Sequence, residues 1–343
     1  MNIDDWTSAR YLPWLYRELK QLDLLEHIAE LEAFGYTVIP PEKVGTTDEH
    51  EAVCEALIRV ACARKQCTEA ELADVFEDGQ ELMRFMLWDD PIFEKTLLNP
   101  AGLGLVQYLL GTNCILSLCD GWLKGKGNSR TGIHADWAQF EMATFPPEPF
   151  TANFNYLLTD YSKDDGALAF VPASHRWRRW PSSEESEYWL DRAQPIEAPK
   201  GSMIIWGDHT WHGSYPRKTE GLRLMMLATF CRPHMQSQEP FRATVTQEAL
   251  DRNPIRFGQL MDVAGAFPFG KSPPRPHEDA SKQKIAPYQS LFDQEPANGA
   301  MRLKQEVNFD AYDLEFMNVI NARAKGKTIP FPDVYRIKDK DKI

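Results

Sequence analysis

Hydrophobic and polar positions follow two different periods along the chain, and the first of them is helical. Over 15–31, leucine and isoleucine recur every three or four residues, which predicts an amphipathic helix that ends at Gly35. The run YTVIP (36–40) then predicts a short strand. Further helical patterns follow at about 48–65 and 69–88.

Two more short helices are expected around Asn99 and Pro100, so the first 110 residues or so should be mostly helical.

From about residue 113 to 231 the pattern changes to short apolar runs separated by Gly, Pro, Asp and Ser. Five runs predict strands: CILSLCDGWL, TANFNYLLT, GALAFVP, GSMIIW and LRLMMLATF. Several short strands with turn signals between them are typical of a β-sandwich or barrel. In LRLMMLATF both alternating faces are apolar except for Arg223, so helices are expected to cover the outside of this strand.

After residue 240 helical patterns return at about 246–262 and 310–325. The Pro-rich run FPFGKSPPRP lies between them and is interpreted as a loop, and a mobile loop is expected over 268–276. No internal repeat or low-complexity tract divides the chain. One domain with helical extensions therefore fits the 343 residues better than two domains.

Composition and charge narrow the class of protein. The net charge of −12 disfavours nucleic acid as a partner, because phosphate binding needs clustered Lys and Arg. No apolar run approaches the length of a membrane span, and the acidic N-terminus shows no signal peptide, so a cytoplasmic protein is expected. The six cysteines form no CxxC pair and are interpreted as reduced, packed thiols.

The run RTGIHADWAQF (130–140) carries the first candidate chemistry. In an extended strand, His134 and Asp136 would point to the same side. They could be two ligands of a metal, a base with the group that orients it, or a hydrogen-bonded pair. Two histidines and one carboxylate form the facial triad that holds non-haem Fe(II). The segment 201–226 reads as strand, turn and strand, and offers His212 as the third ligand, with His209 as its rival.

Arg223 follows His212 by eleven residues and is alone in an apolar strand. A buried guanidinium needs an anion, and its planar fork suits a carboxylate. The anion could be an internal Asp or Glu. An iron site beside an arginine that needs a carboxylate indicates instead a dicarboxylate cosubstrate, which describes 2-oxoglutarate.

Five features together resemble the phytanoyl-CoA dioxygenase family of Fe(II)/2-oxoglutarate oxygenases over about residues 30–260. They are HAD at 134–136, HGS at 212–214, Arg223, GALAFVPASHR at 166–176 and LEAFGYTVIP at 31–40. The segment ASHR departs from the family's more usual Gly-Ser-His form.

The resemblance implies a mainly β fold with helices (α+β), built on a double-stranded β-helix of the jelly-roll or cupin type. Within a single domain 1–343, a helical N-terminal cover (1–110), a jelly-roll core (111–235) and a C-terminal helical extension (236–343) are expected. The resemblance also implies Fe(II) ligation by His134, Asp136 and His212. Arg223 would bind the far carboxylate of 2-oxoglutarate, with the Ser214 hydroxyl assisting.

Several further residues are candidates for substrate or cosubstrate contacts. Asn153 and Asn155 share one face of a predicted strand; Asn155 is assigned to the cosubstrate and Asn153 to the substrate. Trp137, next to the metal carboxylate, and His209 are also assigned to the substrate, although Trp137 could equally be a packed core residue. Arg217 is interpreted as a solvated loop residue. HRWRRW (175–180) is either a grip for an anionic substrate or, more often for such runs, a solvated loop.

The sequence thus predicts an Fe(II)- and 2-oxoglutarate-dependent oxygenase that uses O2. Its substrate is expected to be a small molecule, a lipid-like acid or a secondary metabolite, hydroxylated at an unactivated C–H bond with release of succinate and CO2. The alternative is a non-oxidative cupin that binds metal or senses a ligand without turnover. A nucleic-acid demethylase is disfavoured by the charge, no membrane partner is expected, and the sequence does not determine the oligomeric state.

Overall fold

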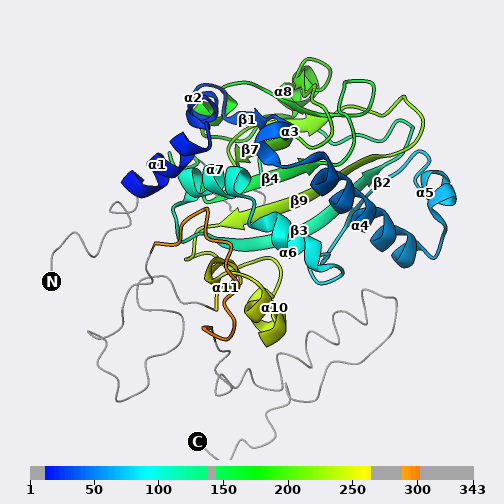
Figure 1. The fold of residues 1–343 in the computed structure, drawn as a ribbon. Coiled ribbons are helices and arrows are strands. Elements are labelled where there is room, and N and C mark those ends of the chain that lie inside the picture. Colours follow the sequence, from blue (N-terminus) through cyan, green and yellow to red (C-terminus); the bar gives the residue numbers. More distant parts are fainter. Residues whose placement is uncertain (1–11, 137–143, 264–287, 302–343) are drawn as a thin grey trace, which may run out of the picture.

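A computed structural model describes residues 12–136, 144–263 and 288–301 of the chain. Two antiparallel sheets form its centre (Figure 1). The larger sheet runs in the order β1 (Tyr36–Ile39), β7 (Met203–Gly207), β4 (Thr151–Leu157), β9 (Arg223–Cys231), β3 (Ile115–Lys124) and β2 (Gln80–Met83). The smaller sheet consists of β6 (Gln194–Pro195), β5 (Leu168–Phe170) and β8 (His212–Ser214).

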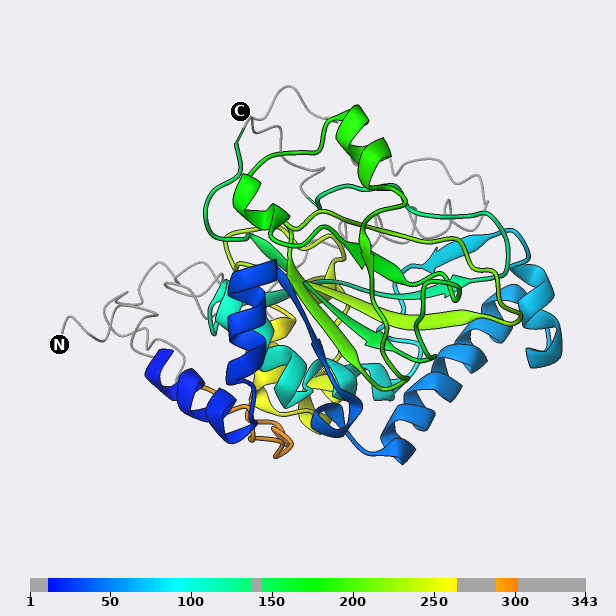
Figure 2. The same ribbon diagram turned by 90° about the horizontal axis from the view of Figure 1, so that it is seen from above.

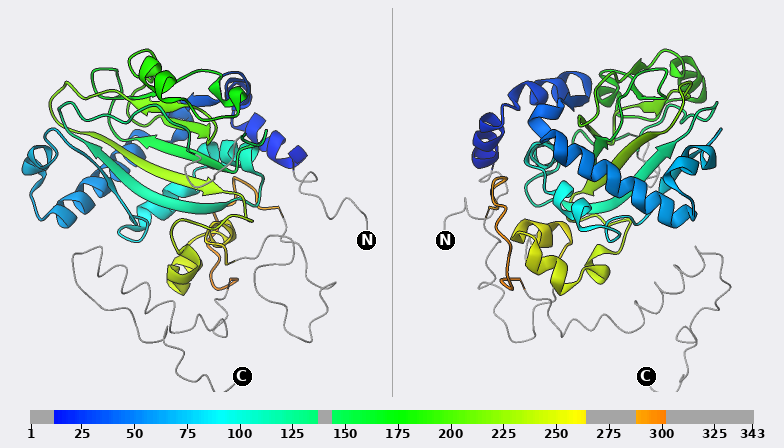
Figure 3. Two further views of the ribbon diagram at one scale, coloured as in Figure 1. Left: turned by 180° about the vertical axis from the view of Figure 1, so that it is seen from behind. Right: turned by 45° about the vertical axis from the view of Figure 1, so that its right-hand side comes forward.

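Helices pack mainly on one face of the larger sheet. The N-terminal half contributes α1 (Leu12–Gln21), α2 (Leu25–Phe34), α3 (Pro41–Val44), α4 (Thr47–Lys65), α5 (Glu69–Val75), α6 (Pro91–Leu97) and α7 (Pro100–Leu110). The rest are the 3-10 helix η3 (Ser174–Trp177), α8 (Ser183–Trp189), α9 (Phe241–Thr244), α10 (Gln247–Arg252) and α11 (Ile255–Leu260). Figure 2 shows α4 running along the sheet, and Figure 3 shows from behind that the long strands lie in front of α4.

The two-residue period of the strands divides their side chains between two cores. In β9, Leu224, Met226 and Ala228 pack against the helices, whereas Met225 and Leu227 point into the space between the two sheets. Residues of β5 in the smaller sheet complete the inner core. Strand β9 is buried along its whole length, as its apolar pattern predicts. The two antiparallel sheets, packed around this inner core, confirm the expected jelly-roll fold.

The N-terminal region contributes more to the sheet than a helical cover would. Strand β1 pairs with β7 at one edge, and β2 pairs with β3 at the other. The helix predicted at 69–88 is therefore wrong in its second half. Its first part is α5, with the capping box at Thr68 and Glu71, but residues 80–83 are drawn into the sheet by pairing with β3.

Two other predicted helices are each divided in two. The pattern over 15–31 is split into α1 and α2 at Asp23, whose φ of 55° is left-handed. The pattern over 246–262 is interrupted at Pro254, because proline lacks the N–H that a continuous helix requires. The strand at 36–40, α4 and the helices flanking Asn99 are confirmed. The predicted helix at 310–325 and the loop at 268–276 lie outside the described residues. All six cysteines are free, as predicted.

Candidate metal centre

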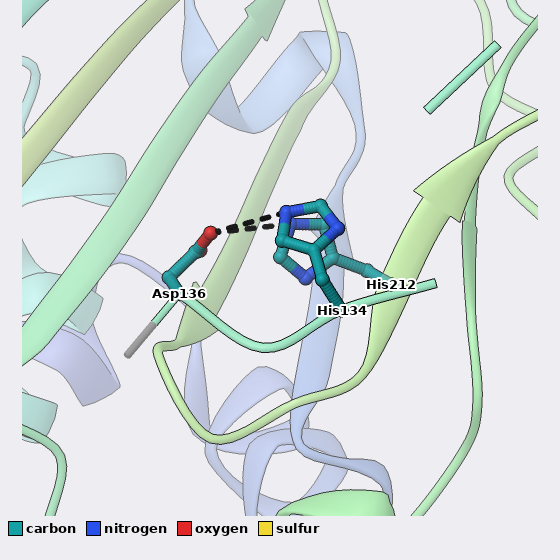
Figure 4. A group of neighbouring side chains, drawn as sticks. All are labelled: His134, Asp136 and His212. Atoms are coloured by element: carbon teal, nitrogen blue, oxygen red, sulfur yellow. Dashed lines mark ion pairs between the residues drawn. The ribbon is translucent and has the colours of Figure 1, made fainter. Parts of the chain in front are cut away.

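Three side chains from two separate segments converge between the sheets. His134 and Asp136 come from the segment that follows β3, and His212 begins β8. One ligand atom from each lies within 4.8 Å of the others, and both imidazoles face the carboxylate (Figure 4). Nε2 of His134 is 3.4 Å from Asp136 Oδ1, and Nε2 of His212 is 3.6 Å from the same oxygen. The structure thus brings together the three residues that the sequence predicts as a triad.

Backbone hydrogen bonds hold the three residues in place. His134 and His212 exchange a reciprocal pair, each N–H donating to the other's carbonyl at 2.9 Å. The N–H of Asp136 donates to the carbonyl of Asp208, also at 2.9 Å. The Asp208 carboxylate in turn accepts from the N–H of Thr151 at 2.8 Å, which ties this turn to β4. The positions of the three side chains are therefore set by the sheet framework.

Both histidines have one ring nitrogen engaged and the other directed at the cluster. Nδ1 of His134 is 2.8 Å from the Gly132 carbonyl, and Nδ1 of His212 is 2.9 Å from the Thr210 carbonyl. A carbonyl accepts only, so each Nδ1 carries a proton, and in the neutral form of each ring Nε2 presents a lone pair. This is the tautomer that a metal-ligating histidine needs.

The carboxylate of Asp136 is held in a similarly asymmetric way. Its Oδ2 accepts from Asn153 Nδ2 at 2.6 Å and from the indole N–H of Trp206 at 3.3 Å. Its Oδ1 faces the two imidazoles. One oxygen is thus fixed by the protein, and the other is available as a single metal ligand.

The ionisation states suit a divalent cation. Burial opposes the charge on Asp136, but the neighbouring His212 and His134 hold the pKa of its carboxyl well below the usual range. Burial lowers the pKa of His212 to about 4. For His134, burial is outweighed by the hydrogen bond and charge of Asp136, so its pKa is raised. A carboxylate beside imidazoles whose Nε2 is directed at it is the donor set of a non-haem iron site.

A cavity of about 540 Å³ lies beside the cluster and is lined by all three of its residues. Most of its remaining wall is apolar and comes from the inner face of the larger sheet and from β5. Asn153 and Asn155 of β4 supply polar groups to the wall. The Asn155 Oδ1 atom is buried and accepts no hydrogen bond from the described residues.

Arg223 is the first residue of β9, and its side chain is fully buried. Its Nη1 donates to the Gly166 carbonyl at 2.7 Å, whereas Nε and Nη2 have no hydrogen-bond partner among the described residues. The guanidinium lies 5.3 Å from the ring of Tyr161 and 5.6 Å from that of Trp122. No carboxylate of the described part of the chain forms an ion pair with it. The internal Asp or Glu that could have neutralised Arg223 is therefore not seen, and the site fits an anionic ligand.

Lys124 lies beside Arg223, and its hydrogen-bond partner Ser214 directly follows Gly213, which lines the cavity. The two residues are register partners across β3 and β9, and Lys124 is also fully buried. Its Nζ donates to Ser214 Oγ at 3.0 Å and to the Tyr215 carbonyl at 2.6 Å. Ser214 Oγ also accepts from the N–H of Thr131, which lines the cavity. With both bonds accepted, the Ser214 hydroxyl can donate its proton to a ligand.

The buried Lys124 should give the protein a distinctive pH dependence. Burial, with the charge of Arg223 added, lowers the pKa of Lys124 to about 6. Between this pH and about 10.4 the unfolded chain holds one more proton than the folded chain, so stability rises with pH by at most about 1.4 kcal/mol per unit. Lys124→Met removes this contribution. We expect the difference in free energy of unfolding, parent minus variant, to increase as the pH rises from 6.5 to 8.5. Urea titrations of both proteins measure this difference. Parallel pH profiles would contradict the assignment.

Only some of the other residues predicted from the sequence line the cavity. Asn153 and Asn155 line the cavity, but His209 does not; its ring stacks on Phe145 with centroids 5.6 Å apart. Trp137 lies outside the described residues. The interpretation of Arg217 as a solvated residue is wrong, because its side chain is buried and pairs with Asp165 at 3.4 Å.

Two contributors to the site were missed by sequence reasoning. Trp206, which binds Asp136, was read only as the end of an apolar strand, and Tyr161, near Arg223, carried no local signal. Trp206 could have been found from the two-residue period, since it shares its face of β7 with Ile204 of the inner core.

Comparison with known proteins identifies the family of the chain. The model of the phytanoyl-CoA dioxygenase family matches residues 31–225. Dioxygenase af480 of Aspergillus fumigatus is 25% identical over 231 residues, which are 66% of this chain and 73% of that protein.

Solved structures show similar folds at low sequence identity. EctD from S. alaskensis, solved in its apo form, superposes with a TM-score of 0.50 at 16% identity over 61% of this chain and 77% of its own. HygX from Streptomyces hygroscopicus, solved with nickel and 2-oxoglutarate bound, gives a TM-score of 0.48 at 17% identity over 62% of this chain and 88% of its own.

The protein is a non-haem dioxygenase of the class that uses iron, 2-oxoglutarate and O2. Within that class, the chain belongs to the phytanoyl-CoA dioxygenase family, as the match over 31–225 shows. The resemblance carried by HAD, HGS and Arg223 is thereby confirmed. Among the helices in the described part of the chain, none is both long and apolar enough to cross a membrane.

Proposed function

We propose that this dioxygenase hydroxylates an unactivated C–H bond of a small molecule, with His134, Asp136 and His212 holding the iron. One observation carries the proposal. The cluster offers two imidazole Nε2 atoms and one carboxylate oxygen to a common point at the wall of a mostly apolar cavity. Each donor group is fixed by a hydrogen bond at its other polar atom, which donates in the two histidines and accepts in Asp136. Three protein ligands on one side leave the remaining coordination positions to cosubstrate and oxygen.

The second part of the proposal places 2-oxoglutarate between the iron and Arg223. The two free nitrogens of the Arg223 guanidinium would bind the far carboxylate, and the Ser214 hydroxyl would donate to it. Asn155 lines the cavity and would contact the cosubstrate through its side-chain amide. The positive charge of Arg223, which no described carboxylate balances, would then be neutralised by the ligand.

Iron with 2-oxoglutarate and O2 supplies an oxidant that can remove hydrogen from an unactivated carbon, with release of succinate and CO2. The protein supplies position and the exclusion of water. Asn153 and Trp206 keep Asp136 oriented, and apolar side chains such as Leu227 surround the reacting region. A carboxylate at position 136 favours oxygen transfer, since halogenases of this type have chloride in its place.

The test is the formation of succinate. Protein purified without oxygen is given Fe(II) and 2-oxoglutarate and then exposed to air, and succinate is quantified over time. We expect slow release without the substrate and faster release when a small apolar acid or secondary metabolite from a candidate library is turned over. Mass spectrometry of the product should show a gain of one oxygen atom. A product without added oxygen would replace hydroxylation by desaturation or another oxidation, and no succinate under any condition would reject the proposal.

A further inference from the structure

One cationic side chain lies at the wall of the cavity that contains the His-Asp-His cluster. Arg84 follows β2 and lines the cavity together with Leu82, two residues earlier on the same face. Histidines aside, Arg84 and Asp136 are the only residues with a formal charge among the described residues that line it. Leu118, Trp122 and other apolar side chains occupy most of the wall nearby.

The backbone that presents Arg84 is held in a strained conformation. Phe85 has a φ of 59°, a left-handed value that is rare for an aromatic residue. The Asp120 carboxylate accepts the Phe85 N–H at 3.1 Å. From α4, Arg64 donates to the carbonyl of Arg84 at 2.6 Å and to that of Phe85 at 3.0 Å. Strain of this kind persists where the surroundings determine it, and such places are often functional.

The charge of Arg84 is only partly balanced by the protein. Its nearest ion pair joins Nη1 to Asp120 Oδ2 at 3.7 Å, beyond hydrogen-bond length, and its side chain is 54% exposed. The Asp120 carboxylate is itself shared with the buried Glu239. Burial raises the pKa of both carboxyls, that of Glu239 to about 9, so the pair carries less negative charge than two free carboxylates would. Asp120 therefore orients Arg84 and leaves its other donors available.

The arginines of HRWRRW do not compete for this role. Arg176 donates to the Glu32 carbonyl at 2.7 Å, and Arg178 to the Phe145 carbonyl at 2.8 Å. Arg179 forms a two-pronged ion pair with Glu185, and none of the three lines the cavity. The sequence-based suggestion that this run grips an anionic substrate is thus not supported.

The position of Arg84 also indicates a length. Asp136 is held by Asn153 of β4, and the sheet order β4-β9-β3-β2 places three inter-strand spacings, about 14 Å, between β4 and β2. We propose that Arg84 binds the carboxylate or phosphate of an otherwise apolar substrate and holds this group about three inter-strand spacings away from the side of the cavity where the carbon is oxidised. This inference rests on the proposed function, because it assumes that the reaction takes place at the His-Asp-His cluster.

Binding of simple probes tests the inference without turnover. Decanoate, decyl phosphate and decanol are titrated by calorimetry under argon, with Fe(II) and saturating 2-oxoglutarate present and again with both omitted. We expect the parent to bind at least one of the two anions at least about tenfold more tightly than decanol. Arg84→Gln should abolish this preference while decanol affinity stays the same, and Arg84→Lys should retain part of it. Whichever anion binds more tightly identifies the headgroup.

Arg59→Gln is the matched control, because Arg59 is an exposed arginine that pairs with Asp90 and does not line the cavity. It should bind all three probes as the parent does. Equal affinities of the parent for the anions and decanol, no binding of either anion, or an unchanged preference in Arg84→Gln would each overturn the inference. Succinate formation by the parent is measured separately, so a failure of the proposed function is distinguishable from a failure at Arg84.

Discussion

Asp136→Asn should lower the affinity of the protein for Fe(II) by at least about a hundredfold and reduce 2-oxoglutarate-dependent succinate formation to background. The carboxylate is the one anionic donor of the cluster, with Oδ1 facing both imidazoles. An asparagine of the same shape has no charge to offset that of the cation. Its amide can keep the hydrogen bonds from Asn153 and Trp206 only by accepting them with its oxygen, which turns the NH2 group, a donor with no lone pair for a metal, towards the imidazoles. Iron binding is measured by anaerobic titration, and succinate in the same preparations.

Asp191→Asn is the matched control for this change. Asp191 is an exposed aspartate paired with Arg130 at 2.7 Å, and it does not line the cavity. We expect iron affinity and succinate formation to stay at parental levels. Circular dichroism of Asp136→Asn should show an intact fold, because Asn preserves the volume of the side chain. Iron affinity and turnover equal to those of the parent in Asp136→Asn would show that the metal is held elsewhere.

The second large effect is expected at Arg223. Arg223→Met should weaken 2-oxoglutarate binding by about a hundredfold or more, because a buried charge-assisted pair is lost. The unliganded protein should be as stable as the parent or more stable. In the parent, two nitrogens of a fully buried guanidinium have no partner, and removing such a charge relieves a desolvation cost. In the parent, 2-oxoglutarate at a hundred times its Kd should add about 2.7 kcal/mol of stability, and the variant should lose this gain.

Thermal unfolding with and without 2-oxoglutarate measures both effects at once. The neighbouring Arg217→Met is the control with the opposite expectation, since Arg217 pairs with Asp165 and donates to backbone carbonyls. It should lower the melting temperature but preserve the stabilisation by 2-oxoglutarate. A variant Arg223→Met that unfolds earlier than the parent yet is still stabilised by 2-oxoglutarate would show that Arg223 is structural and that the cosubstrate binds elsewhere.

The triad was predictable because its signals are local. His134 and Asp136 are two residues apart in an extended segment, and His212 begins a strand that a Gly-Ser pair continues. The strand pattern of 222–230 likewise predicted β9 to within a residue of its bounds, because burial on both faces leaves a nearly continuous apolar run.

Other features depended on pairing between distant segments. Residues 80–83 lie within the helical pattern of 69–88, and only pairing with β3 makes them a strand. Arg84 was therefore not predicted to line the cavity. Arg217 and Arg223 are both arginines near the same turn. Their different roles follow from Asp165, which is 52 residues away from Arg217 in sequence and pairs with it in space. The local pattern separates the two as a strand residue and a loop residue, but it does not indicate that Arg217 is buried as well.

Strand β2 is the last strand of its sheet, joined to the rest through β3 alone. Strand β2 contributes to one wall of the cavity, whereas the metal cluster lies near β4 and β8. An edge strand has fewer neighbours to disturb than a central one, so insertions and substitutions there are tolerated more easily. Changes in β2 and in the turn after it can therefore alter which substrates the enzyme accepts. The residues of the metal cluster, which lie in other segments of the chain, can stay the same.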